Sequence, residues 1–152
     1  MGIPRYIGKG LSTNFQVEFI ISEALAPSLG DLLTYCGGKF TLKTTLMLFH
    51  QLLQRFEHLH SKKIVHCDLK PDNILMGIGK QSKIAYLIDY GISNFYVDRQ
   101  GKHIELQTDC CLIGTVRYAS LYSHQGFELT RRDDLISLGY LMYYLLDGSL
   151  PW

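Results

Sequence analysis

Two short polar segments hold the residues of this sequence that are best suited to chemistry. The first is His66-Cys67-Asp68-Leu69-Lys70-Pro71-Asp72-Asn73, and the second, farther along the chain, is Asp89-Tyr90-Gly91. Apolar residues at 64–65 and 74–76 flank the first segment, so we expect a polar loop between two short strands. Pro71 stiffens this loop, because its ring fixes one backbone dihedral and biases the preceding residue away from the helical region.

The residue types in these segments suit phosphoryl transfer. Carboxylates, an amide and a lysine on a rigid loop can accept a proton, neutralise a phosphate and hold a metal ion. In that reaction a protein supplies position and charge rather than covalent chemistry. For the first segment alone, the alternative interpretation is a surface turn rich in Asp and Pro.

Composition limits the remaining possibilities. The chain has 152 residues, 47% of them hydrophobic, which allows one domain with a sizeable core. Its formal net charge of +1 gives no electrostatic reason to expect nucleic acid as a partner. The four cysteines lack the spacing of a zinc site, and an intracellular location in the cytoplasm or nucleus fits them better than a disulfide framework. The longest apolar run, 135–146, is too short to span a bilayer, and no signal peptide is visible.

The elements that must position the polar segments can be predicted from periodicity and caps. Residues 6–7 and 16–21 are extended candidates joined by a glycine-containing hairpin turn. Ser28 is a good N-cap for a helix over residues 29–36. A longer helix should run from the N-cap Thr41 to about residue 60. Its predicted buried face consists of Leu42, Leu46, Phe49, Leu53 and Phe56.

A second hairpin is predicted between the two polar segments. Residues 77–80 form its turn, because a phosphate-binding loop would need a glycine where Ile74 stands. Residues 84–88 are apolar on both faces, which is typical of a buried strand, and this strand delivers Asp89 at its end.

The last part of the chain is predicted to contain a loop and a buried helix. Residues 94–113 are polar and irregular, which is typical of a functional loop. Asp133 and Asp134 are predicted to cap a helix over 135–146 that is apolar nearly all round and therefore central.

These motifs resemble the C-terminal-lobe half of a eukaryotic protein kinase and, within that superfamily, the casein kinase 1 family. The resemblance implies an α+β, kinase-like fold, in which a mainly helical C-terminal lobe carries short β-hairpins. The motifs follow family order over the whole chain. They are Gly2-Ile3-Pro4, Ala26-Pro27-Ser28-Leu29, Lys70-Pro71-Asp72-Asn73, Leu75-Met76-Gly77-Ile78-Gly79, Leu87-Ile88-Asp89, Gly114-Thr115, Arg117-Tyr118-Ala119-Ser120, Arg131-Arg132-Asp133-Asp134, Ser137-Leu138-Gly139-Tyr140 and Gly148-Ser149-Leu150-Pro151-Trp152.

The resemblance also implies how the chain is divided. Residues 1–26 correspond to the end of the N-terminal lobe and the hinge, and residues 27–152 to the C-terminal lobe, truncated at its end. Met1 follows the family's glycine-rich loop and ATP-anchoring lysine, so the N-terminal lobe is expected to be largely missing. Because each lost charge-stabilising donor costs on the order of 10²–10³ in rate, this chain is expected to be weakly active or inactive alone.

Residue roles follow from the same resemblance, which is to serine/threonine kinases that use ATP and Mg²⁺. Asp68 would accept the proton of a substrate hydroxyl, and Lys70 would neutralise the transferring phosphoryl group. Thr115 would line the hydroxyl. Asn73 and Asp89 would hold the metal ion.

The remaining roles concern binding and support. Arg117 matches a family position that binds an anion, which favours protein substrates that are acidic or already phosphorylated. Glu23 and Leu25 would lie in the hinge that contacts the adenine of ATP. His66 and Asp134 would support the first polar segment from below.

Three departures from the family open an alternative. Cys67 stands where the family carries arginine, Tyr90 replaces phenylalanine, and the segment 120–122 differs at its third residue. Loss of the arginine removes any activation that works through it, so a non-catalytic pseudokinase or scaffold is the alternative function. The residues assigned to catalysis and metal binding favour the enzyme, since a scaffold needs none of them.

Overall fold

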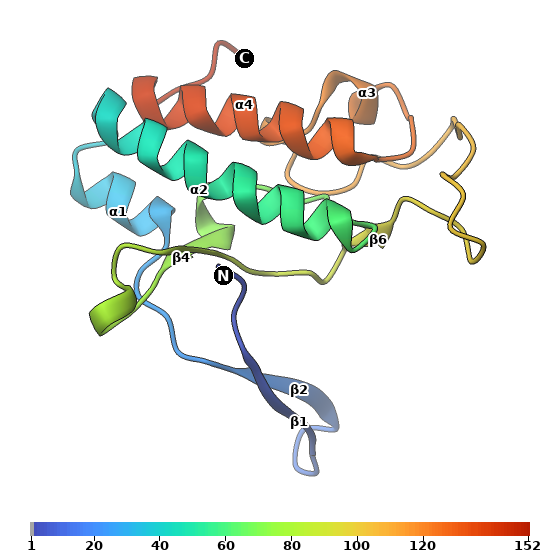
Figure 1. The fold of residues 1–152 in the computed structure, drawn as a ribbon, viewed down its shortest axis with the longest axis horizontal. Coiled ribbons are helices and arrows are strands. Elements are labelled where there is room, and N and C mark those ends of the chain that lie inside the picture. The colour runs from blue at the N-terminus through green and yellow to red at the C-terminus, as the bar shows by residue number, and fades with distance from the viewer. Residues whose placement is uncertain (1) are drawn as a thin grey trace.

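Two long helices form the centre of the fold. Helix α2 spans Leu42–Ser61 and helix α4 spans Arg131–Asp147, and they pack side by side (Figure 1). Together with helix α1 at Leu29–Tyr35 they enclose the apolar core. The computed structural model describes residues 2–152, and no helix in this range is long and apolar enough to cross a membrane.

Short antiparallel strand pairs complete this α+β arrangement. Strand β3 at Ile64–Val65 pairs with β6 at Asn94–Phe95, and β4 at Ile74–Met76 pairs with β5 at Ala85–Leu87. The strands predicted on either side of the first polar segment are therefore confirmed, as is the buried strand before Asp89. Short 3₁₀ turns lie at Pro71–Asn73 (η1), Gly79–Gln81 (η2) and Val116–Tyr118 (η3).

The N-terminal hairpin consists of β1 at Tyr6–Ser12 and β2 at Val17–Ser22, and it projects away from the helices (Figure 1). The hairpin itself was predicted, but its turn was placed too early. Gly8 and Gly10 lie inside β1, and the reversal falls in residues 13–16.

Caps fix the start of each long element. The Ser28 hydroxyl accepts a hydrogen bond from the Asp31 N–H, and the Asp31 carboxylate accepts one from the Ser28 N–H, as predicted for the N-cap of α1. Helix α4 begins at Arg131 with Thr130 as its cap, so its predicted start at 135 was wrong. Asp133 lies inside the first turn and accepts the Thr130 N–H at 2.8 Å. The polar residues of this turn carry no apolar pattern, which is why periodicity missed it.

The buried face of α2 also differs from the prediction. Phe56 is fully buried and Phe49 packs against the core, but Leu42, Leu46 and Leu53 are exposed. The residues buried on α2 are Thr45, Leu48, Leu52, Phe56 and Leu59. Both sets have spacings of three and four residues, so periodicity alone cannot choose between two apolar faces of one helix.

The position of this face can be tested by truncating one leucine on each side of α2. Leu52→Ala should destabilise the protein by about 2–5 kcal/mol, because Leu52 is fully buried and the change leaves a cavity. Leu46→Ala should cost no more than about 1 kcal/mol, since Leu46 is 54% exposed. Urea unfolding of both variants measures the difference, and equal costs would contradict the observed rotation of α2.

Candidate active site

One carboxylate of α4, that of Asp134, holds the loop 66–73 through hydrogen bonds to the loop backbone. Asp134 is only 3% exposed, and its Oδ2 accepts the His66 N–H at 2.9 Å while its Oδ1 accepts the Cys67 N–H at 3.1 Å. His60 Nε2 donates to the same carboxylate at 2.8 Å. Cys67 has a φ of 71°, a left-handed conformation that is unfavourable for a residue with a side chain. The bonds to Asp134 therefore hold the loop in a turn that it would not adopt unaided.

His66 lies fully buried beneath the loop. Its Nε2 donates to the Ile88 carbonyl at 2.9 Å, and its Nδ1 accepts the Asp68 N–H at 3.3 Å. Burial lowers the pKa of His66, so the ring is neutral at pH 7 and carries its proton on Nε2. The neutral ring thus joins the loop to the strand that leads to Asp89.

Three side chains converge on the Asp68 carboxylate. Its Oδ1 accepts the N–H and the hydroxyl of Thr115, at 2.8 and 2.6 Å. Its Oδ2 accepts Lys70 Nζ at 2.8 Å and Asn73 Nδ2 at 3.2 Å. We call this group the Asp68 cluster. It brings together all four residues for which the sequence predicted a catalytic role.

The charges of the Asp68 cluster are set by these contacts. Burial alone would raise the pKa of Asp68, but the hydrogen bonds from Lys70 and Thr115 outweigh it and the net pKa is lowered. The hydrogen bond to Asp68 in turn raises the pKa of Lys70. At neutral pH the cluster therefore presents a fixed carboxylate beside a fixed ammonium group.

Strand pairing places Asp89 beside Asn73. Ile74 lies opposite Leu87, and the Ile88 N–H donates to the Asn73 carbonyl at 3.0 Å. The Asn73 side-chain nitrogen also donates to the Asp68 carbonyl at 2.9 Å. The amide oxygen of Asn73, in contrast, accepts no hydrogen bond within residues 2–152. The exposed Asp89 carboxylate has one bond, from the Gly91 N–H at 3.3 Å.

The oxygens of Asn73 and Asp89 fit a hard cation. Mg²⁺ is commonly held by one or two carboxylates together with phosphate oxygens of the substrate, rather than by a complete protein cage. The part of the chain that the structure describes holds no cluster of three or more His, Cys, Asp or Glu side chains suited to a metal. One carboxylate and one amide oxygen would suffice only when phosphate completes the shell.

Two contacts that position the site were not found from the sequence. Gly114 has a φ of 85°, and a side chain there would collide with the Cys67 carbonyl oxygen, so only glycine lets Thr115 approach Asp68. A glycine directly before Thr115 was the available signal. His60 reaches Asp134 across 74 positions of sequence, and no local pattern reports such a contact.

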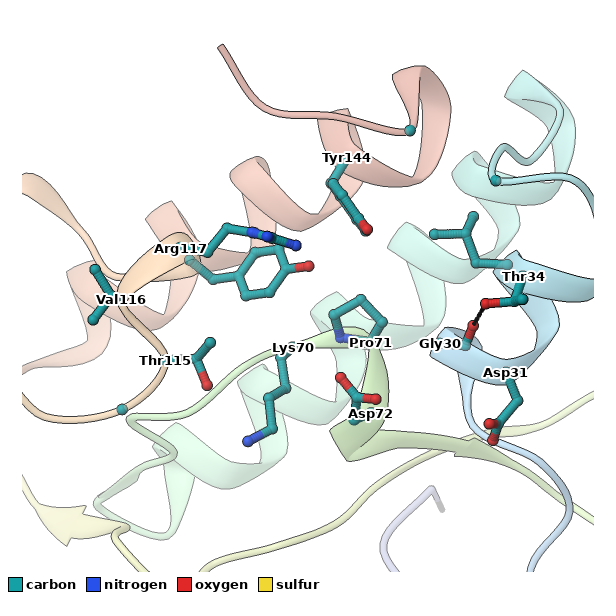
Figure 2. A pocket seen from close by; sticks show the side chains of 15 residues that line it. Gly30, Asp31, Thr34, Lys70, Pro71, Asp72, Thr115, Val116, Arg117 and Tyr144 are labelled. Atoms are coloured by element: carbon teal, nitrogen blue, oxygen red, sulfur yellow. Dashed lines mark hydrogen bonds between the residues drawn. The ribbon is translucent and has the colours of Figure 1, made fainter. Parts of the chain in front are cut away.

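An open pocket extends from the Asp68 cluster toward α1 (Figure 2). Lys70 and Thr115 lie at one end, and Arg117 extends over the pocket toward Tyr144. The exposed Arg117 guanidinium lies 5.9 Å from the centre of the Tyr144 ring and makes no ion pair within residues 2–152. The pocket thus offers an uncommitted positive charge close to the cluster. Its other side is lined by Gly30, Asp31, Thr34, Pro71 and Asp72.

The predicted hinge residues lie apart from the Asp68 cluster. The Glu23 carboxylate accepts the Arg5 N–H at 2.7 Å, and the Ala26 N–H donates to the Met76 carbonyl at 2.8 Å, so this segment runs beside β4. Within residues 2–152 no hydrogen bond joins Glu23 or Leu25 to the cluster, and the Leu25 N–H has no backbone partner.

Comparison with known families agrees with this geometry. The family model described as Protein kinase domain matches residues 10–152, which is most of the chain. The chain therefore belongs to the protein kinase family. Members of this family are phosphotransferases that use ATP and Mg²⁺ and act on protein substrates.

The support that α4 gives to the loop can be tested at Asp134. Asp134→Asn should destabilise the protein by about 1–3 kcal/mol, because an amide offers one acceptor oxygen where the carboxylate serves three donors. Amide hydrogen exchange at His66 and Cys67 should become faster. Asp147→Asn, at the exposed end of the same helix, is the matched control and should leave this exchange unchanged. Unchanged exchange in Asp134→Asn would show that the loop does not depend on the carboxylate.

Proposed function

We propose that the chain carries the catalytic part of a serine/threonine protein kinase in which Asp68 orients and deprotonates a substrate hydroxyl. The observation that carries the proposal is the Asp68 cluster. Lys70, Asn73 and Thr115 meet one carboxylate, although Thr115 comes from a segment 47 positions away. Placing several charged side chains in a partly buried site costs free energy unless each charge is paired.

Each member of the cluster has a task in this reaction. A substrate hydroxyl approaching the Asp68 carboxylate would lie beside Lys70, whose ammonium group neutralises charge on the transferring phosphoryl group. Mg²⁺, when held by Asn73 and Asp89, neutralises the ATP phosphates. The presence of a lysine at position 70 resembles the pattern of serine/threonine kinases rather than that of tyrosine kinases.

The segment after β2 is proposed to contact the adenine of ATP. Its bonds to Arg5 and Met76 fix the backbone on both sides of Leu25, while the Leu25 N–H stays available. An unpaired backbone donor next to a fixed strand suits a planar heterocycle that carries ring-nitrogen acceptors. Glu23 would contribute through its backbone, since its side chain is already bound to Arg5.

Arg117 supports a preference for acidic or phosphorylated substrates, as in the casein kinase 1 family that this sequence resembles. Its guanidinium is exposed, lies in the pocket beside the Asp68 cluster and makes no ion pair within the described residues 2–152. A guanidinium binds carboxylate or phosphate in a bidentate way.

A non-catalytic role is the second candidate, and Cys67 is the observation that favours it. Burial raises the pKa of the Cys67 thiol to about 12, so this position is neutral at physiological pH. The chain thus lacks the positive charge with which the family's arginine engages a phosphorylated loop. The complete Asp68 cluster favours the enzyme over this alternative.

A reducing location such as the cytoplasm or nucleus is proposed for the protein. Cys36, Cys67, Cys110 and Cys111 are all free thiols in the structure, two of them exposed. Exposed thiols persist best where glutathione keeps them reduced.

The metal assignment can be tested with two aspartates, Asp89 and Asp109, whose backbones both adopt the left-handed conformation. Asp89→Asn should abolish Mg²⁺-dependent phosphate transfer from ATP to a serine peptide by the native protein, because it removes the one carboxylate, and with it the negative charge, of the proposed metal site. Asp109→Asn is the control: Asp89 and Asp109 have φ values of 65° and 62°, which asparagine tolerates. A wild-type rate in Asp89→Asn would show that the metal assignment is wrong.

Substrate choice can be tested at Arg117. Arg117→Ala should weaken phosphorylation of acidic or pre-phosphorylated peptides roughly ten- to hundredfold relative to neutral ones, since a charge-assisted contact is worth about 1.5–3 kcal/mol. The ratio of kcat/KM values for the two peptide classes measures the effect, and Arg117→Lys should retain part of it. Equal loss on both classes would mean that Arg117 only anchors its own segment, to which Trp152 Nε1 already donates at 3.1 Å.

A further inference from the structure

A second charged pocket is lined by His60, the residue whose ring donates to Asp134. It is found where α2 ends and α4 begins, next to β6 (Figure 1). It shares no lining residue with the pocket that contains Arg117. The acidic, basic and imidazole side chains that line it are Glu57, His60, Lys63, His103, Arg131 and Arg132.

Arg131 is held in this pocket by an aromatic platform. Its guanidinium lies 4.4 Å from the centre of the Tyr96 ring, a distance at which cation–π attraction is effective. Tyr96 is only 4% exposed, and its hydroxyl donates to the His60 carbonyl at 2.6 Å while its N–H donates to the Lys63 carbonyl at 3.1 Å. The platform is therefore fixed by α2 and by the turn after it, and it pre-organises the guanidinium.

The pocket carries an excess of positive charge. Neither Arg131 nor Lys63 makes an ion pair within residues 2–152, whereas Arg132 is already paired with Asp133 at 3.2 Å. Glu57 is the one carboxylate among the lining residues. His103 adds a ring whose centre lies 5.6 Å from that of Tyr96, so His103 and Arg131 both lie against the same aromatic side chain. Two uncommitted cations and a neighbouring imidazole suit a tetrahedral oxyanion.

We propose that this pocket binds a phosphoryl group, with Arg131 and Lys63 as its ligands and His103 beside it. The phosphoryl group is either free inorganic phosphate or the phosphorylated side chain of a protein, since both present the same dianion. His60 lines the pocket and donates to Asp134, so the occupant would lie one residue away from the carboxylate that holds the loop 66–73. The site does not depend on catalysis by the Asp68 cluster.

The proposal can be tested by NMR of the histidine rings at pH 7 and constant ionic strength. Inorganic phosphate is titrated in one series, and a phosphoserine peptide with its unphosphorylated counterpart in another. The His103 and His60 ring signals should shift in a saturable way with phosphate or with the phosphopeptide, and chloride should leave them unchanged. Tighter binding of the phosphopeptide than of phosphate assigns the site to a phosphorylated side chain, and the reverse order assigns it to the free ion.

Substitutions of the proposed ligands test whether the phosphoryl group binds in this pocket. Arg131→Gln should weaken the saturable shift by at least about tenfold, the loss expected for one charge-assisted contact. Lys63→Asn should also weaken it, and asparagine tolerates the φ of 68° at that position, so this variant carries the test if Arg131→Gln does not fold. Arg117→Gln removes the guanidinium of the pocket beside the Asp68 cluster and should leave the His103 shift intact. Absence of a saturable shift, its persistence in folded Arg131→Gln and Lys63→Asn, or its loss in Arg117→Gln would each overturn the proposal.

Discussion

The site depends on the hydrogen bonds that Asp134 accepts from the loop 66–73. A buried carboxylate without partners would cost several kcal/mol, and the structure avoids this cost by aiming two loop amides and His60 at Asp134. The same bonds hold Cys67 in its left-handed conformation, and this turn directs the Asp68 side chain toward Thr115. Because α4 carries Asp134 and packs along α2, the position of the loop is fixed by the most buried part of the molecule.

The contacts that fix Asp68 also limit what it can do. Four hydrogen bonds stabilise its ionised form and lower its pKa, which makes it a weak proton acceptor before substrate arrives. Phosphoryl transfer tolerates this, because its transition state is loose and little proton transfer has to precede it. An oriented carboxylate beside an oriented ammonium group supplies what the reaction needs most, which is position and charge.

Much of the fold followed from local patterns, and the exceptions are instructive. Ser28, Thr41 and the strands beside the loop were predictable because caps and apolar runs act over a few residues. The buried face of α2 was not, since α2 is apolar on two sides and its packing against α4, β3 and β5 decides which side is covered. The types of the residues in the Asp68 cluster were visible in the sequence. The contact of His60 with Asp134 was not, because it depends on how two helices pack.

Cys67 shows how a departure from the family pattern can leave the site geometry intact. The loop is held through the backbone N–H groups of His66 and Cys67, so the side chain at position 67 is free to change without moving Asp68. What changes is the side chain itself, whose thiol donates weakly to the Val65 carbonyl at 3.7 Å. The segment before Thr115 is held by backbone bonds: the Cys110 N–H donates to the Gly126 carbonyl at 2.9 Å, and the Glu128 N–H donates to the Gln107 carbonyl at 3.1 Å. Thr115 itself is anchored by the Asp68 carboxylate, which accepts its N–H at 2.8 Å and its hydroxyl at 2.6 Å and involves no side chain at position 67.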